Sequence, residues 1–283
     1  MRVSRLVSGR GFAIKFPVLG VVYSYLFRHL KPAQDTIMVD VRGIKMYADV
    51  RGYNGLGPGS IHGAYEKGET ELVKKTVREG MAVVDIGANI GYYTLIIAKI
   101  VGGKGKVYAF EPDPENYRLL VKNIELNGYD NVIPMQKAVS NRTGTTELFL
   151  HPVDMGSHRI YNSNDGRESI KIEMVSLDEF FEGKENKVDV IKMDVEGAEI
   201  AALQGMKNIL QNNDDVKIFT EFSPAATRTF GYSPEEGLNE LIKSGFKLYH
   251  INDLKGETTP VSIDSLMQMC PGEMFTSIYI ARH

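Results

Sequence analysis

Four acidic residues each follow a short apolar run, which is where an α/β sheet places its chemistry. These residues are Asp85, Glu111, Asp194 and Glu221, after apolar runs at 81–84, 107–110, 188–193 and 216–220. Because the carboxyl ends of parallel strands meet at one edge of a sheet, we expect these side chains to face one site. Carboxylates in such a place can hold sugar hydroxyls, accept a proton or bind a divalent cation.

A glycine turn lies between the first apolar run and a second apolar segment at 92–100. The turn reads Gly87-Ala-Asn-Ile-Gly91, and Glu111 follows 20 residues after Gly91. Glycine lets the backbone turn sharply and lets a ligand approach the main chain, and the following helix offers free N–H groups. The sequence therefore predicts the strand, turn and helix of a nucleotide-binding unit, with Glu111 accepting hydrogen bonds from ribose hydroxyls.

The spacing of the glycines selects among nucleotide ligands. The pattern is G-x-x-x-G, and it differs from the G-x-G-x-x-G that cradles a pyrophosphate. A turn with fewer glycines suits a ligand that has one nucleoside and no diphosphate, and S-adenosylmethionine (SAM) fits this description. The alternative is a glycine-rich turn that binds nothing.

The order of the predicted elements indicates an α/β fold. Strands and helices alternate from residue 81 to residue 244, including a strand at 132–138 and a helix at 199–210. Two further strands at 247–250 and 275–280 end the chain. This order predicts a Rossmann-like, mostly parallel sheet of about seven strands whose last pair is antiparallel. Runs at 147–150 and 170–175 predict an additional strand pair, and a polar loop at 151–167 lies between them. This loop is predicted to be either a substrate lid or a surface excursion.

The N-terminal part of the chain differs from the rest. Residues 1–34 carry six Lys or Arg and no Asp or Glu, and their apolar run at 16–27 is too short to span a bilayer. Two interpretations stay open: a helix that packs on the domain or on a second subunit, or a basic surface anchor on an anionic membrane. Residues 36–50 predict a hairpin around Arg42-Gly43, and the glycine-rich residues 52–63 predict a loop. We expect an N-terminal extension over residues 1–60 and one domain over residues 61–283.

Composition excludes several classes of protein. The 283 residues are 43% hydrophobic and 24% charged, with a formal net charge of −3, so no general affinity for nucleic acid is expected. The single cysteine, Cys270, excludes an intrachain disulfide framework and a cysteine-cluster metal site. A reducing compartment, the cytoplasm, is the expected location, with peripheral membrane contact if residues 1–34 are an anchor.

Three segments of the chain resemble the FkbM-type methyltransferases. They are the segments at 84–94, 110–114 and 191–199, of which Asp194-Val-Glu-Gly-Ala-Glu199 is the most specific. The resemblance covers roughly residues 60 to 282 and implies a class I SAM-dependent methyltransferase with a seven-stranded Rossmann-like sheet. It further implies O-methylation of a hydroxyl on a sugar, a glycolipid or a natural product.

The resemblance also implies the cofactor-binding residues. Those expected to contact SAM are Glu66, Asp85, Gly87, Ala88, Asn89, Gly91, Tyr92, Glu111, Pro112, Asp113, Lys137, Ala138 and Asp194. Among them, the residues of the turn would line the methionine part and Glu111 would hold the ribose. The segment 136–138 would border the adenine, and Glu66 would reach the SAM or acceptor side.

Methyl transfer to a sugar hydroxyl needs a group that accepts the hydroxyl proton, or a metal. Asp194 is the first candidate for the base, with an N-cap of the following helix as the alternative role. Lys192 lies two residues earlier on the same face of its strand, so its partner is expected to be Asp194 or a substrate oxygen. His158, on the polar loop, is the alternative base.

Asp194 and Glu221 together could bind Mg²⁺, because that ion prefers oxygen ligands. No second acid follows Glu221, where the sequence reads Phe222-Ser223, and this departure disfavours a metal. Two other functions stay open. A nicotinamide-dependent oxidoreductase is disfavoured by the missing third glycine, and a SAM-binding module without catalysis would show no turnover. The expected partner is a small-molecule or glycan hydroxyl acceptor, and a homo-oligomer is compatible with the sequence.

Overall fold

The structure is a computed structural model that describes residues 36–49, 66–152, 154–184 and 187–282. The predictions for residues 1–34, and for a loop at 52–63, lie outside these ranges. Within the described ranges, no helix has both the length and the apolar character that crossing a membrane requires.

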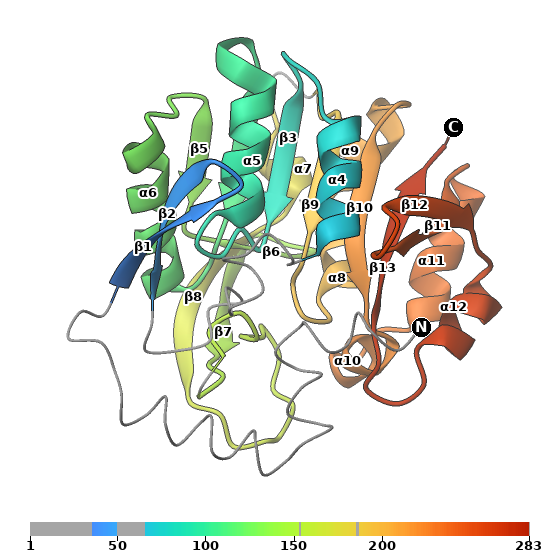
Figure 1. The fold of residues 1–283 in the computed structure, drawn as a ribbon. Helices are drawn as coiled ribbons and strands as arrows, with labels where there is room; N and C mark the ends of the chain where they lie inside the picture. The colour runs from blue at the N-terminus through green and yellow to red at the C-terminus, as the bar shows by residue number, and fades with distance from the viewer. Residues whose placement is uncertain (1–35, 50–65, 153, 185–186, 283) are drawn as a thin grey trace.

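A sheet of eight strands forms the centre of the molecule (Figure 1), in the order β12-β11-β13-β10-β9-β3-β4-β5. The strands are β3 (Ala82–Ile86), β4 (Lys106–Phe110), β5 (Val132–Met135), β9 (Val190–Met193), β10 (Lys217–Phe222), β11 (Lys247–Asn252), β12 (Glu257–Pro260) and β13 (Thr276–Ala281). The strands β5, β4, β3, β9 and β10 are parallel, whereas β13 is antiparallel to both β10 and β11. The predicted α/β fold with a mostly parallel sheet and an antiparallel last pair is confirmed.

The strand order reverses between β3 and β9. From β3 the chain builds outward through β4 to β5, and it then returns to place β9 on the other side of β3. Ligands in open α/β sheets bind at such a reversal, beyond the carboxyl ends of the strands, because the connections there diverge and leave a crevice. The glycine turn after β3 and Asp194 after β9 are the two sides of this crevice.

Helices cover both faces of the sheet, and each face has its own apolar core (Figure 1). One face carries α4 (Lys67–Thr76), α5 (Tyr92–Val101) and α6 (Pro114–Asn127). The other carries α7 (Leu177–Phe180), α8 (Glu199–Gln204), α9 (Lys207–Asn212), α11 (Pro234–Lys243) and α12 (Ile263–Met269). Burial on both faces explains why strands such as β9 are apolar at nearly every position.

Two small sheets complete the described structure. The strands β6 (Ala138–Val139), β7 (Gly144–Phe149) and β8 (Ser169–Val175) form one, in the order β6-β8-β7, and the antiparallel β7 and β8 are the predicted strand pair. The hairpin of β1 (Thr36–Val41) and β2 (Ile44–Asp49) forms the other and turns at Arg42-Gly43, as predicted. Both turn residues have positive φ, 56° and 77°, which matches the twist that a two-residue hairpin loop needs.

Two predicted elements had wrong boundaries, and three elements were missed. The strand expected at 132–138 ends at Met135, and Ala138 belongs to the small sheet. The helix expected from 199 to 210 is two helices, α8 and α9. A Cβ on Gly205 would lie 2.0 Å from Ser140 O, and Asp178 caps the new helix start by accepting from Asn208 N and Ile209 N. The elements β12, α12 and α10 (Pro224–Thr229) were not predicted.

We expect Asn123→Ala to lower the free energy of unfolding by about 2 kcal/mol. This asparagine of α6 is fully buried; it accepts from Tyr47 N at 2.6 Å and donates to Tyr47 O and Ile90 O. Its loss leaves those backbone groups without partners, and urea unfolding with an unchanged m-value measures the effect. The partly exposed Asn127→Ala on the same helix is the control, and equal losses in both variants would contradict the explanation.

Candidate functional site

The glycine turn packs directly against the backbone that follows β9. Gly87 has φ 79°, and a Cβ at this position would lie 1.9 Å from Asp194 O. Asp194 N in turn donates to Ile86 O at 2.9 Å, and Gly87 N donates to Phe110 O. Only glycine fits here, so the turn brings the ends of β3, β4 and β9 together. Gly91 has a different task, since its missing Cβ makes room for the Leu120 side chain of α6.

Glu111 connects the glycine turn to the start of α6. Its Oε2 accepts from Asn89 N at 2.8 Å and its Oε1 accepts from Asp113 N at 2.9 Å. Asn89 has φ 50°, a conformation that directs its N–H toward this carboxylate. Burial raises the pKa of Glu111 to about 8 despite these hydrogen bonds. Each oxygen keeps a second lone pair, so the carboxylate can still accept from two hydroxyls of a ligand.

Asp85 ends β3 below the turn and is 2% exposed. Its Oδ2 accepts from Thr94 Oγ1 of α5 at 2.5 Å. Burial raises its pKa to about 6. Asp85 therefore fixes the start of α5 against the strand as well as lining the cavity at the turn.

Three carboxylates meet on the other side of the crevice. Glu66, Asp194 and Glu221 each offer an oxygen that lies within 4.8 Å of the others, an arrangement that could hold a metal ion. Tyr93 OH donates to Glu66 Oε2 at 2.8 Å. Burial, assisted by the neighbouring acids, raises the pKa of Glu66 to about 8 and that of Glu221 well above its ordinary range. Close like charges that are poorly solvated retain protons, so this acidic cluster can take up and hold a proton near neutral pH.

Lys192 supplies positive charge to this acidic cluster. Its Nζ lies 3.2 Å from Glu69 Oε1 and 4.8 Å from the centre of the Tyr93 ring, and both charged side chains are almost wholly buried. Burial lowers the pKa of Lys192, but Glu69 and the cluster carboxylates outweigh that effect and keep the pKa above its ordinary value. The ion-pair partner is thus Glu69 from α4, where the sequence suggested Asp194 or a substrate oxygen.

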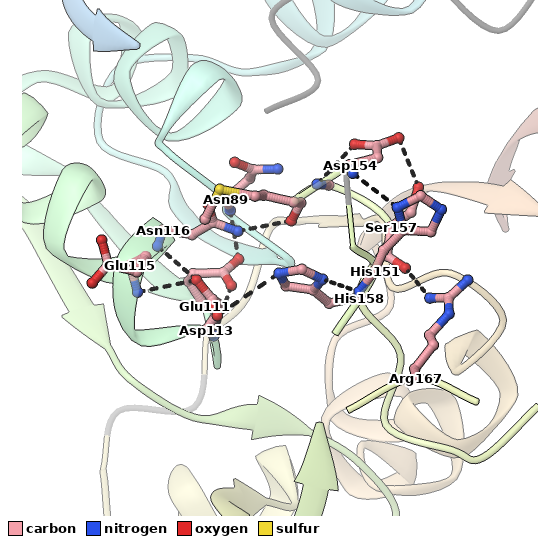
Figure 2. Close-up of polar contacts among 12 residues, drawn as sticks. Asn89, Glu111, Asp113, Glu115, Asn116, His151, Asp154, Ser157, His158 and Arg167 are labelled. Carbon is pink, nitrogen blue, oxygen red and sulfur yellow. Dashed lines mark hydrogen bonds and ion pairs between the residues drawn. The ribbon is translucent and has the colours of Figure 1, made fainter. Parts of the chain in front are cut away.

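The polar loop forms one wall of the cavity at the nucleotide side (Figure 2). His158 Nδ1 accepts from His151 N at 3.0 Å, so a neutral His158 carries its proton on Nε2, which faces Asp113 Oδ2 at 3.8 Å. Burial lowers the pKa of His158. Its basic nitrogen is thus already engaged, and the side chain lies next to Asp113. The role of His158 as the catalytic base remains a prediction. Asp194 is the better candidate, because it is not placed in this contact.

The cavity beyond the strand ends brings most of the predicted residues together. It is lined by Asp85, Gly87, Ala88, Asn89, Tyr92, Glu111, Pro112, Lys137, Ala138, His158, Lys192 and Asp194. Gly91, Asp113, Glu66 and Glu221 do not line it: the first two support its walls, and the last two belong to the acidic cluster. The N-cap of α8 is Ala198, without a side-chain hydrogen bond, so the alternative role of Asp194 as that cap is not seen.

Several residues of the site were missed by the sequence analysis. They are Glu69, Tyr93, Asn116, Met155 and Ile160. Glu69 follows Glu66 by one helical turn, a spacing that could have linked both to one site. Glu196 has φ 52°, which the sequence does not indicate, and its backbone oxygen accepts from Tyr161 OH of the loop.

The pKa of Glu66 predicts how stability changes with pH. Its folded-state pKa of about 8 exceeds the ordinary 4.5, so the folded protein binds this proton more tightly than the unfolded chain does. The wild type therefore loses stability from this group as pH rises from about 4.5 to about 8. Glu66→Gln stays neutral, so its free energy of unfolding should exceed that of the wild type by more than about 1 kcal/mol at pH 8.5.

Urea unfolding at pH 5 and pH 8.5 measures this difference, which should be smaller at pH 5. Glu71→Gln on the same helix is the matched control, because ion pairs with Lys74 and Arg42 outweigh burial and lower the pKa of Glu71. Its effect should be absent or of opposite sign. If the free energy of unfolding changes with pH equally in Glu66→Gln and in the wild type, Glu66 is ionised at neutral pH and the raised pKa is wrong.

The chain is similar to several known proteins. The hexuronic acid methyltransferase AglP of Haloferax volcanii is 32% identical over 151 residues, which are 52% of this chain and 59% of that protein. The methyltransferase sdnD of Sordaria araneosa is 28% identical, over 44% of this chain and 60% of that protein. The matches thus span about three fifths of each relative. Among solved structures, M. jannaschii TYW2 in complex with AdoMet aligns with a TM-score of 0.47 and 19% identity, covering 88% of this chain and 85% of that chain.

A family model extends across the glycine turn, Glu111, Asp194 and Glu221. The model for the methyltransferase FkbM domain matches residues 85–248, more than half of the chain. This range contains the whole parallel part of the sheet beyond the first three residues of β3. The chain is therefore a member of the methyltransferase FkbM domain family.

Proposed function

We propose that the protein transfers a methyl group from SAM to a hydroxyl oxygen of a sugar-like acceptor. The observation that carries this proposal is the pairing, at one strand-order reversal, of Glu111 and the glycine turn with the acidic cluster of Glu66, Asp194 and Glu221. Glu111 and the glycine turn are suited to binding a nucleoside, and the acidic cluster is suited to accepting a proton from the acceptor.

The cofactor would lie across the crevice. Its ribose would bind Glu111, whose oxygens are already oriented by Asn89 N and Asp113 N. Pro112 and Ala138 line the cavity where the adenine would lie. The methionine part would cross the glycine turn, which brings the positive sulfonium close to Asp194 and the other acids of the cluster. Opposite charges in a poorly solvated site attract strongly, so the cluster favours this orientation.

The reaction is an in-line displacement. The acceptor oxygen attacks the methyl carbon, a C–O bond forms and the S–CH₃ bond breaks, so the sulfonium becomes a neutral thioether. The hydroxyl proton passes to a carboxylate of the cluster, for which Asp194 is the candidate because it lines the cavity. Alignment of oxygen, carbon and sulfur lowers the barrier, and the base removes the proton as the C–O bond forms.

A neutral sugar hydroxyl is the proposed acceptor group. The relative AglP is named for its action on a hexuronic acid, which makes a sugar acceptor the first to test. Around the proposed transfer position the described residues supply several carboxylates and one buried ammonium, Lys192. An anionic acceptor oxygen would meet repulsion there, whereas a neutral hydroxyl would not.

A divalent cation is a secondary element of this proposal. The three carboxylates of the cluster would provide oxygen ligands of the kind that Mg²⁺ prefers, and the ion would then polarise the acceptor oxygen. Lys192 already offsets part of their negative charge, so the cluster has a counter-charge without a metal, and we infer that the carboxylates act without one. Turnover assays with added Mg²⁺ and with EDTA distinguish the metal-dependent reaction from the metal-independent one.

Calorimetric titration with S-adenosylhomocysteine (SAH) tests cofactor binding. We expect micromolar binding by the wild type and, at pH 8.5, where Glu111 is mostly ionised, a Kd at least about tenfold higher for Glu111→Gln, because a charge-assisted contact contributes about 1.5–3 kcal/mol. Glu115→Gln is the matched control: this acid lies in the first turn of α6, which follows Glu111 in the chain, and is half-exposed. Folded wild type that fails to bind SAH would remove the methyltransferase proposal.

Asp194→Asn tests the base. With an acceptor found by screening hexosides and hexuronic acids for SAH release, we expect kcat to fall by about 10²–10⁴ while SAM affinity changes little. Asp189→Asn, on the residue just before β9 at its opposite end, is the control; Asp189 accepts from Ala82 N and lies away from the cavity. Full activity of Asp194→Asn would show that Asp194 is not the base and would leave Glu66 and Glu221 as the candidates.

A further inference from the structure

Asn116 is a buried polar residue of the cavity wall that the proposed reaction does not use. It is the third residue of α6, is 2% exposed and lines the cavity together with Glu111 and Pro112. Its backbone N–H donates to Asp113 Oδ1 at 2.8 Å, which fixes the position of its Cα. Figure 2 shows its side chain between Glu111 and the polar loop.

The two ends of the Asn116 carboxamide have different surroundings. Nδ2 donates to Met155 O of the polar loop at 3.0 Å. Because a backbone carbonyl only accepts, this contact determines which end of the amide is nitrogen. Oδ1 is buried and, among the residues that the structure describes, has no hydrogen-bond partner. A buried carbonyl oxygen without a donor is unfavourable, so Oδ1 needs an N–H or O–H group from a molecule in the cavity.

The proposed cofactor has few such groups. Its adenosine part offers two ribose hydroxyls and one exocyclic amine. Glu111 carries lone pairs for hydroxyls, and Asn116 lies three residues after Asp113, whose N–H donates to Glu111. A continuous hydrogen-bonded path thus runs from Asn89 N through Glu111, Asp113 and Asn116 to Met155 O (Figure 2).

We propose that Asn116 binds the nucleoside of the cofactor and thereby ties cofactor occupancy to closure of the loop 154–168. The inference rests on the proposed function, because it takes the cavity ligand to be SAM. Oδ1 accepts from a hydroxyl or amine of the adenosine while Nδ2 holds Met155 O. Both ends of one rigid amide are satisfied only when the nucleoside is bound and the loop is closed.

The first test is titration of SAH into the wild type, Asn116→Leu and Asn127→Leu. Leucine keeps the size of the side chain and removes both polar ends. We expect the Kd for SAH to rise about three- to tenfold in Asn116→Leu, the loss of one hydrogen bond, and to stay unchanged in the control. Asn127 is on the same helix, and its amide donates to Lys45 O and Asn123 O, away from the cavity. Asn116→Ala replaces the leucine variant if that variant does not fold.

Cofactor analogues identify the donor. S-inosylhomocysteine lacks the exocyclic amine, and 2′-deoxy-SAH and 3′-deoxy-SAH each lack one hydroxyl. For the group that Asn116 binds, the wild type should lose affinity for the analogue, and Asn116→Leu should lose less or nothing. Equal losses in wild type and variant for all three analogues would overturn the inference, as would an unchanged Kd for SAH in Asn116→Leu.

Amide hydrogen exchange measures whether the loop 154–168 closes when SAH binds. SAH should slow exchange across 154–168 in the wild type, and much less in Asn116→Leu at saturating SAH. If SAH protects the loop equally in both proteins, Asn116 does not link cofactor binding to loop closure, and that part of the inference is wrong. If the wild type itself does not bind SAH, the proposed function fails as well. If the wild type binds and the variant binds equally, only the role of Asn116 fails.

Discussion

The contact between Gly87 and Asp194 O is the constraint on which the site depends. The absence of a Cβ at one position lets two parallel strands bring their carboxyl ends into direct backbone contact at the strand-order reversal. The glycine turn is then held by Phe110 O on one side and by the chain after β9 on the other. The nucleotide side and the acidic side of the crevice are consequently separated by a single turn of backbone.

Charge balance is the second constraint. Glu66 and Glu69 come from the start of α4, whereas Lys192 and Asp194 come from β9 and its end. The helix is fixed at this place partly by the chain between β11 and β12, since a Cβ on Gly68 would overlap the backbone of Asp253. Removing one partner of the Lys192–Glu69 pair would leave a buried charge uncompensated, which is strongly destabilising. The acidic cluster therefore depends on elements from three distant parts of the chain.

The sequence was sufficient to predict the parallel sheet, the glycine turn, Glu111 and the strand-end acids, because each follows from local apolar patterning and strand order. It was insufficient for contacts that depend on tertiary packing. The pairing of Lys192 with Glu69 requires α4 to lie across β9, and nothing in the local sequence of either element specifies that placement. The break between α8 and α9 similarly results from Gly205 packing on Ser140, which is distant in sequence. The sequence likewise does not show that Asn116 Oδ1 is buried by the polar loop with no hydrogen-bond partner among the described residues.

The acidic cluster also has a consequence for what happens after the reaction. In the proposed transfer, the cofactor enters with a positive sulfonium and leaves as a neutral thioether, while the cluster gains a proton. Attraction between Asp194 and the cofactor is therefore present before the methyl group moves and absent afterwards. A cavity that binds through charge at this end and through hydrogen bonds at the nucleoside end retains the spent cofactor less tightly than the fresh one. The same carboxylates that accept the proton would thus limit product inhibition and favour exchange of the cofactor.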